Sequence, residues 1–151
     1  MKPKIYLDNC CYNRPYDDQS QIRINLESQA KLLIQKLISF EKLELVTSVM
    51  SYYENSRNPD KKHREAISAF MKKHETMCVT ENDTIWNIQG SIVSTGIKEA
   101  DAFHLASAIF ANCDCFITTD DRILKYRTES IHIINPIQFI IEMRRSNVHR
   151  L

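Results

Sequence analysis

Short apolar runs alternate along the chain with longer segments in which apolar residues recur at helical spacing. The short runs are typical of buried strands, because each is shorter than a helix needs to be. They cover residues 4–7, 43–47, 77–80, 115–118 and 131–134. The longer periodic segments predict helices at residues 22–37, 59–71, 85–92, 102–109 and 136–143, two of which begin at a proline.

Alternation of strands and helices predicts the fold class. Strands joined by helical crossovers form a mostly parallel sheet that helices cover on both faces. We therefore expect an α/β fold, a three-layer α/β/α sandwich around a mostly parallel five-stranded sheet. No linker, repeat or low-complexity tract interrupts the sequence, so residues 1–151 are predicted to form a single domain.

Composition narrows the function classes. The chain has only two glycines, Gly90 and Gly96, which excludes the glycine-rich loops that hold nucleotide cofactors through backbone amides. Lys and Arg number 20 and Asp and Glu 19, a net charge of +1, so nucleic-acid binding has to come from local patches and not from a global positive field.

The N-terminus and the cysteines predict the compartment. The first apolar run reaches Asp8 too early for a secretory signal, and no stretch is long enough to span a membrane. Five cysteines in no metal or disulfide spacing are expected to be reduced thiols that pack as small hydrophobic residues. We therefore expect a cytoplasmic protein; no particular role follows for Cys10 or Cys11.

Carboxylates close two of the predicted strands. Asp8 ends the first, and Asp120 with Asp121 follows the fourth, so these acids are expected at one edge of the sheet. Ligands bind to parallel sheets outside the carboxyl ends of the strands, where the strand order reverses. Taken singly, an aspartate at a strand end is also a common turn or helix-capping residue.

Two further acids lie on predicted helices. Glu54 lies in a helical segment, Val49 to Glu54, that follows the second strand, and Asp101 lies in the first turn of an alanine-rich helix. Taken alone, Glu54 suits a solvated helix position, and Asp101 suits the positive end of a helix dipole, as Glu99 also does. His104 follows Asp101 by one turn, and with no second histidine nearby in the sequence we expect it to pack beside the crevice.

These acids occur in an order that resembles the PIN-domain ribonucleases, the family that includes the VapC-type toxins of toxin–antitoxin pairs. The resemblance covers nearly the whole chain. Four segments carry it: a strand ending in an acid, a serine six residues before a helical glutamate, an acid heading an alanine-rich helix, and a T-x-D turn. They are Ile5-Tyr6-Leu7-Asp8, Ser48 to Glu54, Asp101 to Ala108, and Thr118-Thr119-Asp120.

The sequence departs from the family pattern in two places. Asn9 follows the first acid where the family commonly has Ser or Thr, and an amide can also bind a phosphate oxygen or a water on a metal ion. Asp121 follows Asp120 directly, and either can serve as the fourth acid. We favour Asp120 because it keeps the T-x-D spacing.

The resemblance implies an endoribonuclease that hydrolyses RNA phosphodiester bonds with one or two Mg²⁺ or Mn²⁺ ions. Asp8, Glu54, Asp101 and Asp120 would be the catalytic and metal-binding acids, since two carboxylates ~4 Å apart repel by about 4 kcal/mol at an effective dielectric constant near 20 and a divalent cation removes that conflict. Substrate contacts are assigned to residues that adjoin these acids. They are Asn9, Arg14, Ser48, Thr118 and Arg122.

Partners and rival functions follow from the same reading. As a toxin the protein would bind an antitoxin protein, and the resemblance also predicts a homodimer. A solitary PIN nuclease outside such a pair and a non-catalytic PIN-like binding module are the alternatives. A phosphoryl-accepting Asp8 ranks below these, because the dehalogenase-like phosphatases need a second aspartate where this chain has Cys10.

Overall fold

A parallel sheet forms the centre of the molecule. The computed structural model describes residues 2–150, and of residues 147–150 the backbone alone. The five strands have the order β3-β2-β1-β4-β5, and each of the four pairings is parallel. Their bounds are β1 Lys4–Leu7, β2 Glu44–Ser48, β3 Glu75–Val79, β4 Cys115–Ile117 and β5 His132–Ile134.

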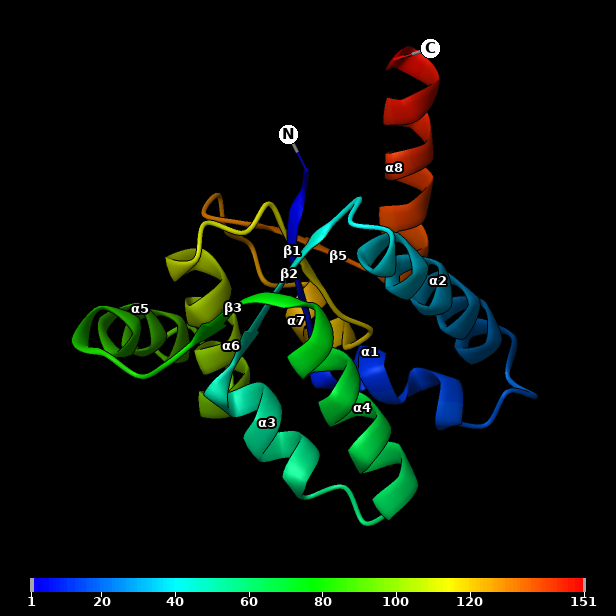
Figure 1. The fold of residues 1–151 in the computed structure, drawn as a ribbon. Coiled ribbons are helices and arrows are strands. Elements are labelled where there is room, and N and C mark those ends of the chain that lie inside the picture. The colour runs from blue at the N-terminus through cyan, green and yellow to red at the C-terminus, as the bar shows by residue number, and fades with distance from the viewer. Residues whose placement is uncertain (1, 151) are drawn as a thin grey trace.

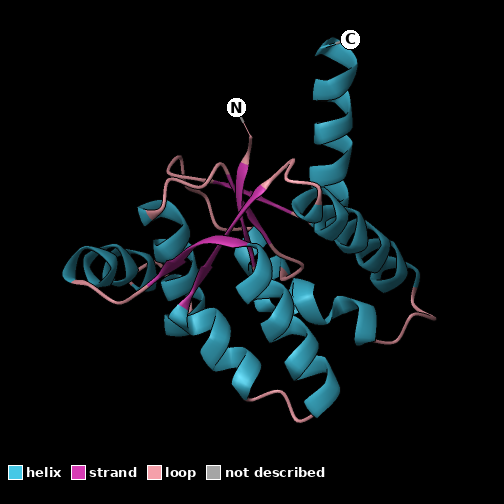
Figure 2. Ribbon diagram, viewed as in Figure 1, coloured by secondary structure: helices cyan, strands magenta, loops and turns pink. Residues whose placement is uncertain are grey.

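Helices cover both faces of this sheet (Figures 1 and 2), which confirms the predicted three-layer α/β/α fold. The five long periodic segments are helices, and the turn that carries Glu54 is one as well. Three short pieces, α1, η1 and α7, were not predicted, because helices this short show no periodicity. The bounds are α1 Asn9–Asn13, η1 (a 3₁₀ helix) Arg14–Tyr16, α2 Ile22–Ser39, α3 Val49–Ser56, α4 Lys61–His74, α5 Asp83–Val93, α6 Glu99–Phe110, α7 Asp121–Leu124 and α8 Pro136–Arg150.

Alternate residues of the central strands supply two separate cores. Tyr6, Val46 and Phe116 pack with α5 and α6 on one face of the sheet. Ile5 and Leu45 pack with α1, α2, α4 and α8 on the other face. Successive side chains of a strand point to opposite faces, so the side chain of Tyr6 lies on the face that α5 and α6 cover, and those of its neighbours Ile5 and Leu7 lie on the other.

Helix α2 is rotated relative to its apolar pattern. The apolar periodicity predicts a buried stripe on this helix; Ala30 and Ile34 are buried as predicted, whereas Ile22, Leu26 and Leu33 are exposed. The buried stripe contains Glu27 and Lys31 instead, both almost fully enclosed. The apolar pattern was misleading here because two charged side chains are buried through contacts that the sequence does not display.

Strand β3 begins two residues before the predicted run, at Glu75. It is an edge strand that pairs with β2 alone and shifts register at Leu45 and Val46. Met77 and Cys78 on it are exposed, so Cys78 differs from the prediction that the cysteines are buried. All five cysteines are free, and among the described residues no helix is long and apolar enough to cross a membrane.

Helix α8 runs to Arg150, and the side chains of residues 147–150 lie outside the description. The sequence led us to expect that the last residues of the domain are disordered or ordered by a partner. That expectation extends to Leu151, which also lies outside the described residues.

Lys31 is a buried charge in the core that Ile5 and Leu45 form with α1, α2, α4 and α8. Its ammonium group donates to Gln35 Oε1 at 2.6 Å and lies near the rings of Tyr12 and Phe70, and burial lowers its pKa to about 8. We expect Lys31→Met to raise the free energy of unfolding at pH 7 by about 1–2 kcal/mol, because an uncompensated buried charge is removed.

The pH dependence of this gain has a defined sign. The folded protein binds fewer protons than the unfolded chain between pH values of about 8 and 10.5, so wild-type stability rises with pH in that window. The advantage of Lys31→Met should therefore shrink when urea unfolding is repeated at pH 9.5. A gain that stays constant between pH 7 and pH 9.5 would contradict this account.

Candidate active site

The candidate site lies where the strand order reverses. Strands β1 and β4 are neighbours at the centre of the sheet. From β1 the chain adds β2 and β3 on one side, and it then returns to add β4 and β5 on the other side. Asp8 directly follows β1, and its backbone N–H donates to Ile117 O at 2.9 Å. Asp120 follows β4 by three residues. The expected placement of the two strand-end acids at one edge is thereby met through the β1–β4 pairing.

Asp8 is a buried acid surrounded by donors. Its Oδ1 accepts the backbone N–H of Asn9 at 2.8 Å, which caps α1, and its Oδ2 accepts the hydroxyl of Thr118 at 2.8 Å. The thiol of Cys10 also donates to Oδ2, at 3.5 Å. Capping the helix and facing the site are thus compatible roles for one aspartate, and the Asp8 carboxylate is held in a fixed orientation.

Glu54 and His104 approach Asp8 from two helices. One ligand atom from each of Asp8, Glu54 and His104 lies within 4.8 Å of the other two. His104 Nε2 is hydrogen-bonded to Glu54 Oε1, which joins α6 to α3. Glu54 is partly exposed, whereas His104 is fully buried. The sequence prediction that His104 packs beside the crevice omits this bond.

Asp101 is near all the other acids. It lies in the first turn of α6, and its pKa is raised by burial and by the negative charges of Asp8, Asp120 and Glu54, against an opposing effect of His104. A carboxyl group whose pKa is raised by its acidic neighbours shares one electrostatic environment with them. The charges of Asp8, Glu54 and Asp120 therefore act on Asp101, while among the described residues the group whose ligand atoms lie within 4.8 Å of one another is Asp8, Glu54 and His104.

Asp120 and Asp121 have different surroundings. Asp120 caps α7 by accepting the backbone N–H of Arg122 at 2.9 Å, and its charge reaches Asp101. Asp121 is exposed and accepts both Nη groups of Arg23 at 2.9 Å, and this hydrogen-bonded pair lowers its pKa. These placements favour Asp120 as the fourth acid of the cluster.

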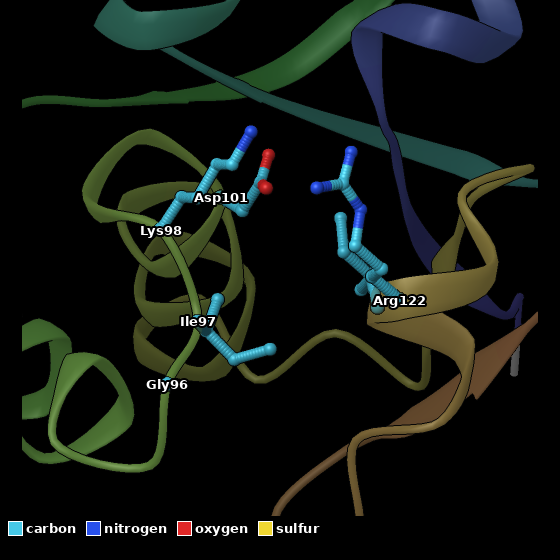
Figure 3. A pocket seen from close by; sticks show the side chains of 6 residues that line it. Gly96, Ile97, Lys98, Asp101 and Arg122 are labelled. Carbon is cyan, nitrogen blue, oxygen red and sulfur yellow. The ribbon is translucent and has the colours of Figure 1, made fainter.

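A small pocket opens beside Asp101 (Figure 3). It has a volume of about 70 Å³ and is lined by Gly96, Ile97, Lys98, Asp101, Arg122 and Ile123. Figure 3 shows Lys98 and Asp101 on one wall and Arg122 on the other. The Arg122 side chain is 75% exposed, with Nε 3.8 Å from Asp120 Oδ1. Two cationic side chains, Lys98 and Arg122, thus flank Asp101 in this pocket.

The other predicted substrate contacts have structural partners. Arg14 forms ion pairs with Glu27 and Asp17, so its guanidinium group is already engaged. The Thr118 hydroxyl is buried and, besides donating to Asp8, accepts the backbone N–H of Asp120 at 3.1 Å. Asn9 is half-buried at the start of α1.

Ser48 is buried as well and lies behind the acids. Its Oγ accepts the N–H groups of Met50 and Ser51 and caps α3, and it contacts the Tyr6 hydroxyl at 2.7 Å. Of the five assigned substrate contacts, Arg122 is the one whose side chain lines the pocket.

Sequence reasoning missed Lys98 and Tyr6 at this site, and it gave His104 a packing role alone. Lys98 precedes Asp101 by three residues, and His104 follows it by three, so helical spacing could have placed both on its face. Tyr6 precedes Asp8 by two residues, and because the backbone is still extended at Asp8 this spacing could have placed both side chains on the same side. Its hydroxyl lies 2.5 Å from His104 Nδ1.

The buried polar groups behind the acids are tuned by their surroundings. Burial raises the pKa of the Tyr6 hydroxyl, which keeps it protonated. Burial lowers the pKa of His104, but the hydrogen bond to Glu54 and the charges of Asp8, Glu54 and Asp101 outweigh burial and raise it. The acidic cluster thus attracts positive charge.

The donor set fits a hard divalent cation. Carboxylate oxygens of several acids in one partly buried place are the ligands that Mg²⁺ and Mn²⁺ take. Burial, and after it the negative charges of Asp8, Asp120 and Glu54, raise the pKa of Asp101, and a bound cation would offset that repulsion. Among the described residues the group able to hold a metal contains one histidine, two acids and no cysteine, whereas structural zinc sites are built from cysteines and histidines.

Comparisons with known proteins identify the fold. No protein-family model matches the chain, and no curated protein matches its sequence. The structure is similar to a chain in the crystal structure of VapBC2 from Rickettsia felis bound to a DNA fragment from their promoter, with a TM-score of 0.57 and 12% sequence identity. The match covers 87% of this chain and 98% of that one. The fold is therefore PIN-like, as the sequence predicted.

Proposed function

We propose that this PIN-like protein is a metal-dependent endoribonuclease. The observation that carries the proposal is the clustering of Asp8, Glu54 and His104 beside the reversal of the strand order, together with the pKa of Asp101, which burial and the charges of Asp8, Asp120 and Glu54 raise. A cluster of opposed carboxylates costs stability unless it serves a cation. The PIN-like fold supports nuclease chemistry at this edge of the sheet.

In this proposal the four acids bind metal ions or orient the attacking water. Asp8, Asp101 and Asp120 would hold one or two Mg²⁺ or Mn²⁺ ions, and Glu54 would be a further ligand or would orient the attacking water. When bound, such an ion supplies Lewis-acid activation of water and offsets the charge that develops on the phosphate. The hydroxyl of Thr118 and the backbone N–H of Asn9 donate to the Asp8 carboxylate and so fix its orientation before substrate arrives.

The RNA substrate would be bound in part by the cationic side chains of Lys98 and Arg122, which line the pocket. Lys98 and Arg122 flank Asp101, so a phosphate of the RNA backbone can be neutralised on its way to the acids. This supports nucleic-acid binding without a strongly basic surface, in keeping with the net charge of +1.

We further propose that the nuclease acts as the toxin of a two-protein pair, because the similar structure is that of a VapBC2 complex. A solitary nuclease would use the same acids without an inhibitor. A homodimer is still a prediction, and the exposed apolar residues of α2, Leu26 and Leu33, offer a surface for it.

Cleavage of single-stranded RNA in the presence of Mg²⁺ or Mn²⁺, and its loss in EDTA, tests the function. Asp101→Asn should remove this cleavage. In EDTA the same variant should melt about 2 °C higher than wild type, because a carboxylate repelled by its neighbours is gone. Gel assays with RNA and DNA of equal sequence, together with thermal unfolding, measure both effects.

Glu99→Gln is the matched control, since Glu99 lies in the same first turn of α6 and is exposed. It should cleave RNA as wild type does and gain no melting temperature. If Asp101 served only the helix dipole, Asp101→Asn would lower the melting temperature and leave cleavage intact. Cleavage that persists in EDTA would refute the metal-dependent function.

A further inference from the structure

A chain of hydrogen bonds leads from the interior of the sheet to Glu54. It begins at Tyr6 on β1, passes through the imidazole of His104 on α6 and ends at the Glu54 carboxylate on α3. Of these three residues, Tyr6 and His104 are completely buried, and Glu54 has a side chain that solvent reaches in part. Every hydrogen in this chain therefore has to find a protein partner, because water is excluded from the interior.

The hydroxyl hydrogens behind Tyr6 can be counted. Ser48 Oγ accepts two backbone N–H groups and Ser51 Oγ accepts one, so both oxygens serve as acceptors toward the backbone. Among the described residues the Tyr6 oxygen is the hydrogen-bond partner that remains for both serine hydroxyls, at 2.7 and 3.1 Å. A phenolic oxygen accepts two hydrogen bonds and donates one. The single Tyr6 hydrogen is then directed to His104.

This count determines which nitrogen of His104 carries a hydrogen. Nδ1 accepts from Tyr6, so in the neutral ring the hydrogen is on Nε2, which donates to Glu54 Oε1. In the doubly protonated ring Nε2 carries a hydrogen too. Either way Nε2 has no lone pair to offer a metal ion, although it lies within 4.8 Å of the ligand atoms of Asp8 and Glu54.

We propose that His104 is a positioning residue: backed by Tyr6, it holds Glu54 Oε1 by an Nε2–H bond and fixes the carboxylate for its role at the metal site. The metal role rests on the proposed function, whereas the hydrogen-bond assignment does not. Ser48, six residues before Glu54, then acts indirectly: its hydroxyl donates to the Tyr6 oxygen, and this bond directs the Tyr6 hydrogen to the imidazole of His104. Partners of this kind, one bond removed from a ligand, typically change metal affinity or activity by about 10–100-fold when lost.

Two variants at one position separate positioning from packing. His104→Gln keeps an N–H donor within reach of Glu54, whereas His104→Leu fills the space without a donor. We expect the affinity for Mn²⁺, measured by titration calorimetry, to fall about 10–100-fold in His104→Leu and to stay within a few-fold of wild type in His104→Gln. Equal affinities in both variants and wild type would mean that His104 only packs.

Ser107→Ala is the matched control, because Ser107 is buried one turn further along α6 and, among the described residues, its hydroxyl donates within its own helix, to Phe103 O. It should bind Mn²⁺ as wild type does. Thermal unfolding of all three variants shows whether a loss of affinity reflects loss of the fold. The recovery in His104→Gln then keeps the proposal testable even if His104→Leu is unstable.

Spectroscopy tests the hydrogen assignment directly and without reference to RNA. A long-range ¹H–¹⁵N spectrum of the metal-free protein should show a hydrogen on Nε2 of His104, and pulsed electron paramagnetic resonance of the Mn²⁺ complex should show no directly bound nitrogen. A bare Nε2, or a nitrogen bound to Mn²⁺, would overturn the assignment and make His104 a ligand. Wild-type protein that binds Mn²⁺ but cleaves no RNA would refute the nuclease function and leave the positioning role standing.

Discussion

Asp8→Asn should reduce metal-dependent RNA cleavage by more than about 100-fold, beyond the 10–100-fold that loss of an outer partner costs. Asp8 follows β1 directly, is buried, and has donors from Asn9, Thr118 and Cys10 on its two oxygens. An amide removes the negative charge that would hold a divalent cation. Rates from a labelled RNA at saturating Mg²⁺ or Mn²⁺ measure the loss.

The fold should survive this change, because asparagine caps helices as well as aspartate does. Asp114→Asn is a suitable control. Asp114 precedes β4 at the opposite end of the same strand pair, where its Oδ2 accepts the backbone N–H of Lys4 at 2.8 Å. This control should cleave RNA at the wild-type rate. Retained metal-dependent cleavage in Asp8→Asn would remove Asp8 from the catalytic site and with it the proposed mechanism.

Glu27→Ala should lower the free energy of unfolding by about 3 kcal/mol, near the lower end of what breaking a buried ion pair costs. Glu27 is fully buried on α2 and accepts from Arg14 at 2.7 Å, from Arg23 at 3.1 Å and from Asn135. Its removal leaves two guanidinium groups without their shared anion. The 49% exposure of the Arg23 side chain moderates the cost, because water can solvate that group.

Urea unfolding at pH 7 measures this loss, and Glu65→Ala gives the comparison. Glu65 on α4 pairs with Lys61 at 4.0 Å, and both side chains are largely exposed, so the change should stay within about 0.5 kcal/mol. Similar losses in both variants would show that the buried cluster around Glu27 contributes no more than a surface pair. Asp121 is held by Arg23, so this cluster also anchors the start of α7 beside Asp120.

The sequence predicted the elements that apolar periodicity marks. The five strands and four of the five long helices were placed to within a few residues, whereas α8 extends to Arg150, beyond the predicted end at residue 143. The pairing of β1 with β4 brings the strands that precede Asp8 and Asp120 together. Periodicity does not show α1 and α7, which are too short, although Asp8 and Asp120 were recognised as residues able to cap such helices. The edge position of β3 was also hidden, because exposure of Met77 and Cys78 depends on where the strand lies in the sheet.

The four acids could be listed from the sequence, but their partners could not. Asp120 and Asp121 are adjacent in the chain, and only the ion pair of Asp121 with Arg23, 98 positions away, separates their roles. Arg14 adjoins the first acid in sequence and yet is directed to Glu27. Side-chain pairing over such separations follows from how helices pack, which local spacing does not encode.

By itself the sequence determined the α/β class, the order of the elements and the acids at the ends of β1 and β4, because apolar periodicity and strand-end carboxylates are local properties of the chain. The tertiary structure decided which face of α2 is buried, which of the two adjacent aspartates acts on the charge of Asp101, and that Tyr6, His104 and Glu54 form one hydrogen-bonded line. The physical reason is that a buried polar group must find its partner wherever the packing of strands and helices provides one.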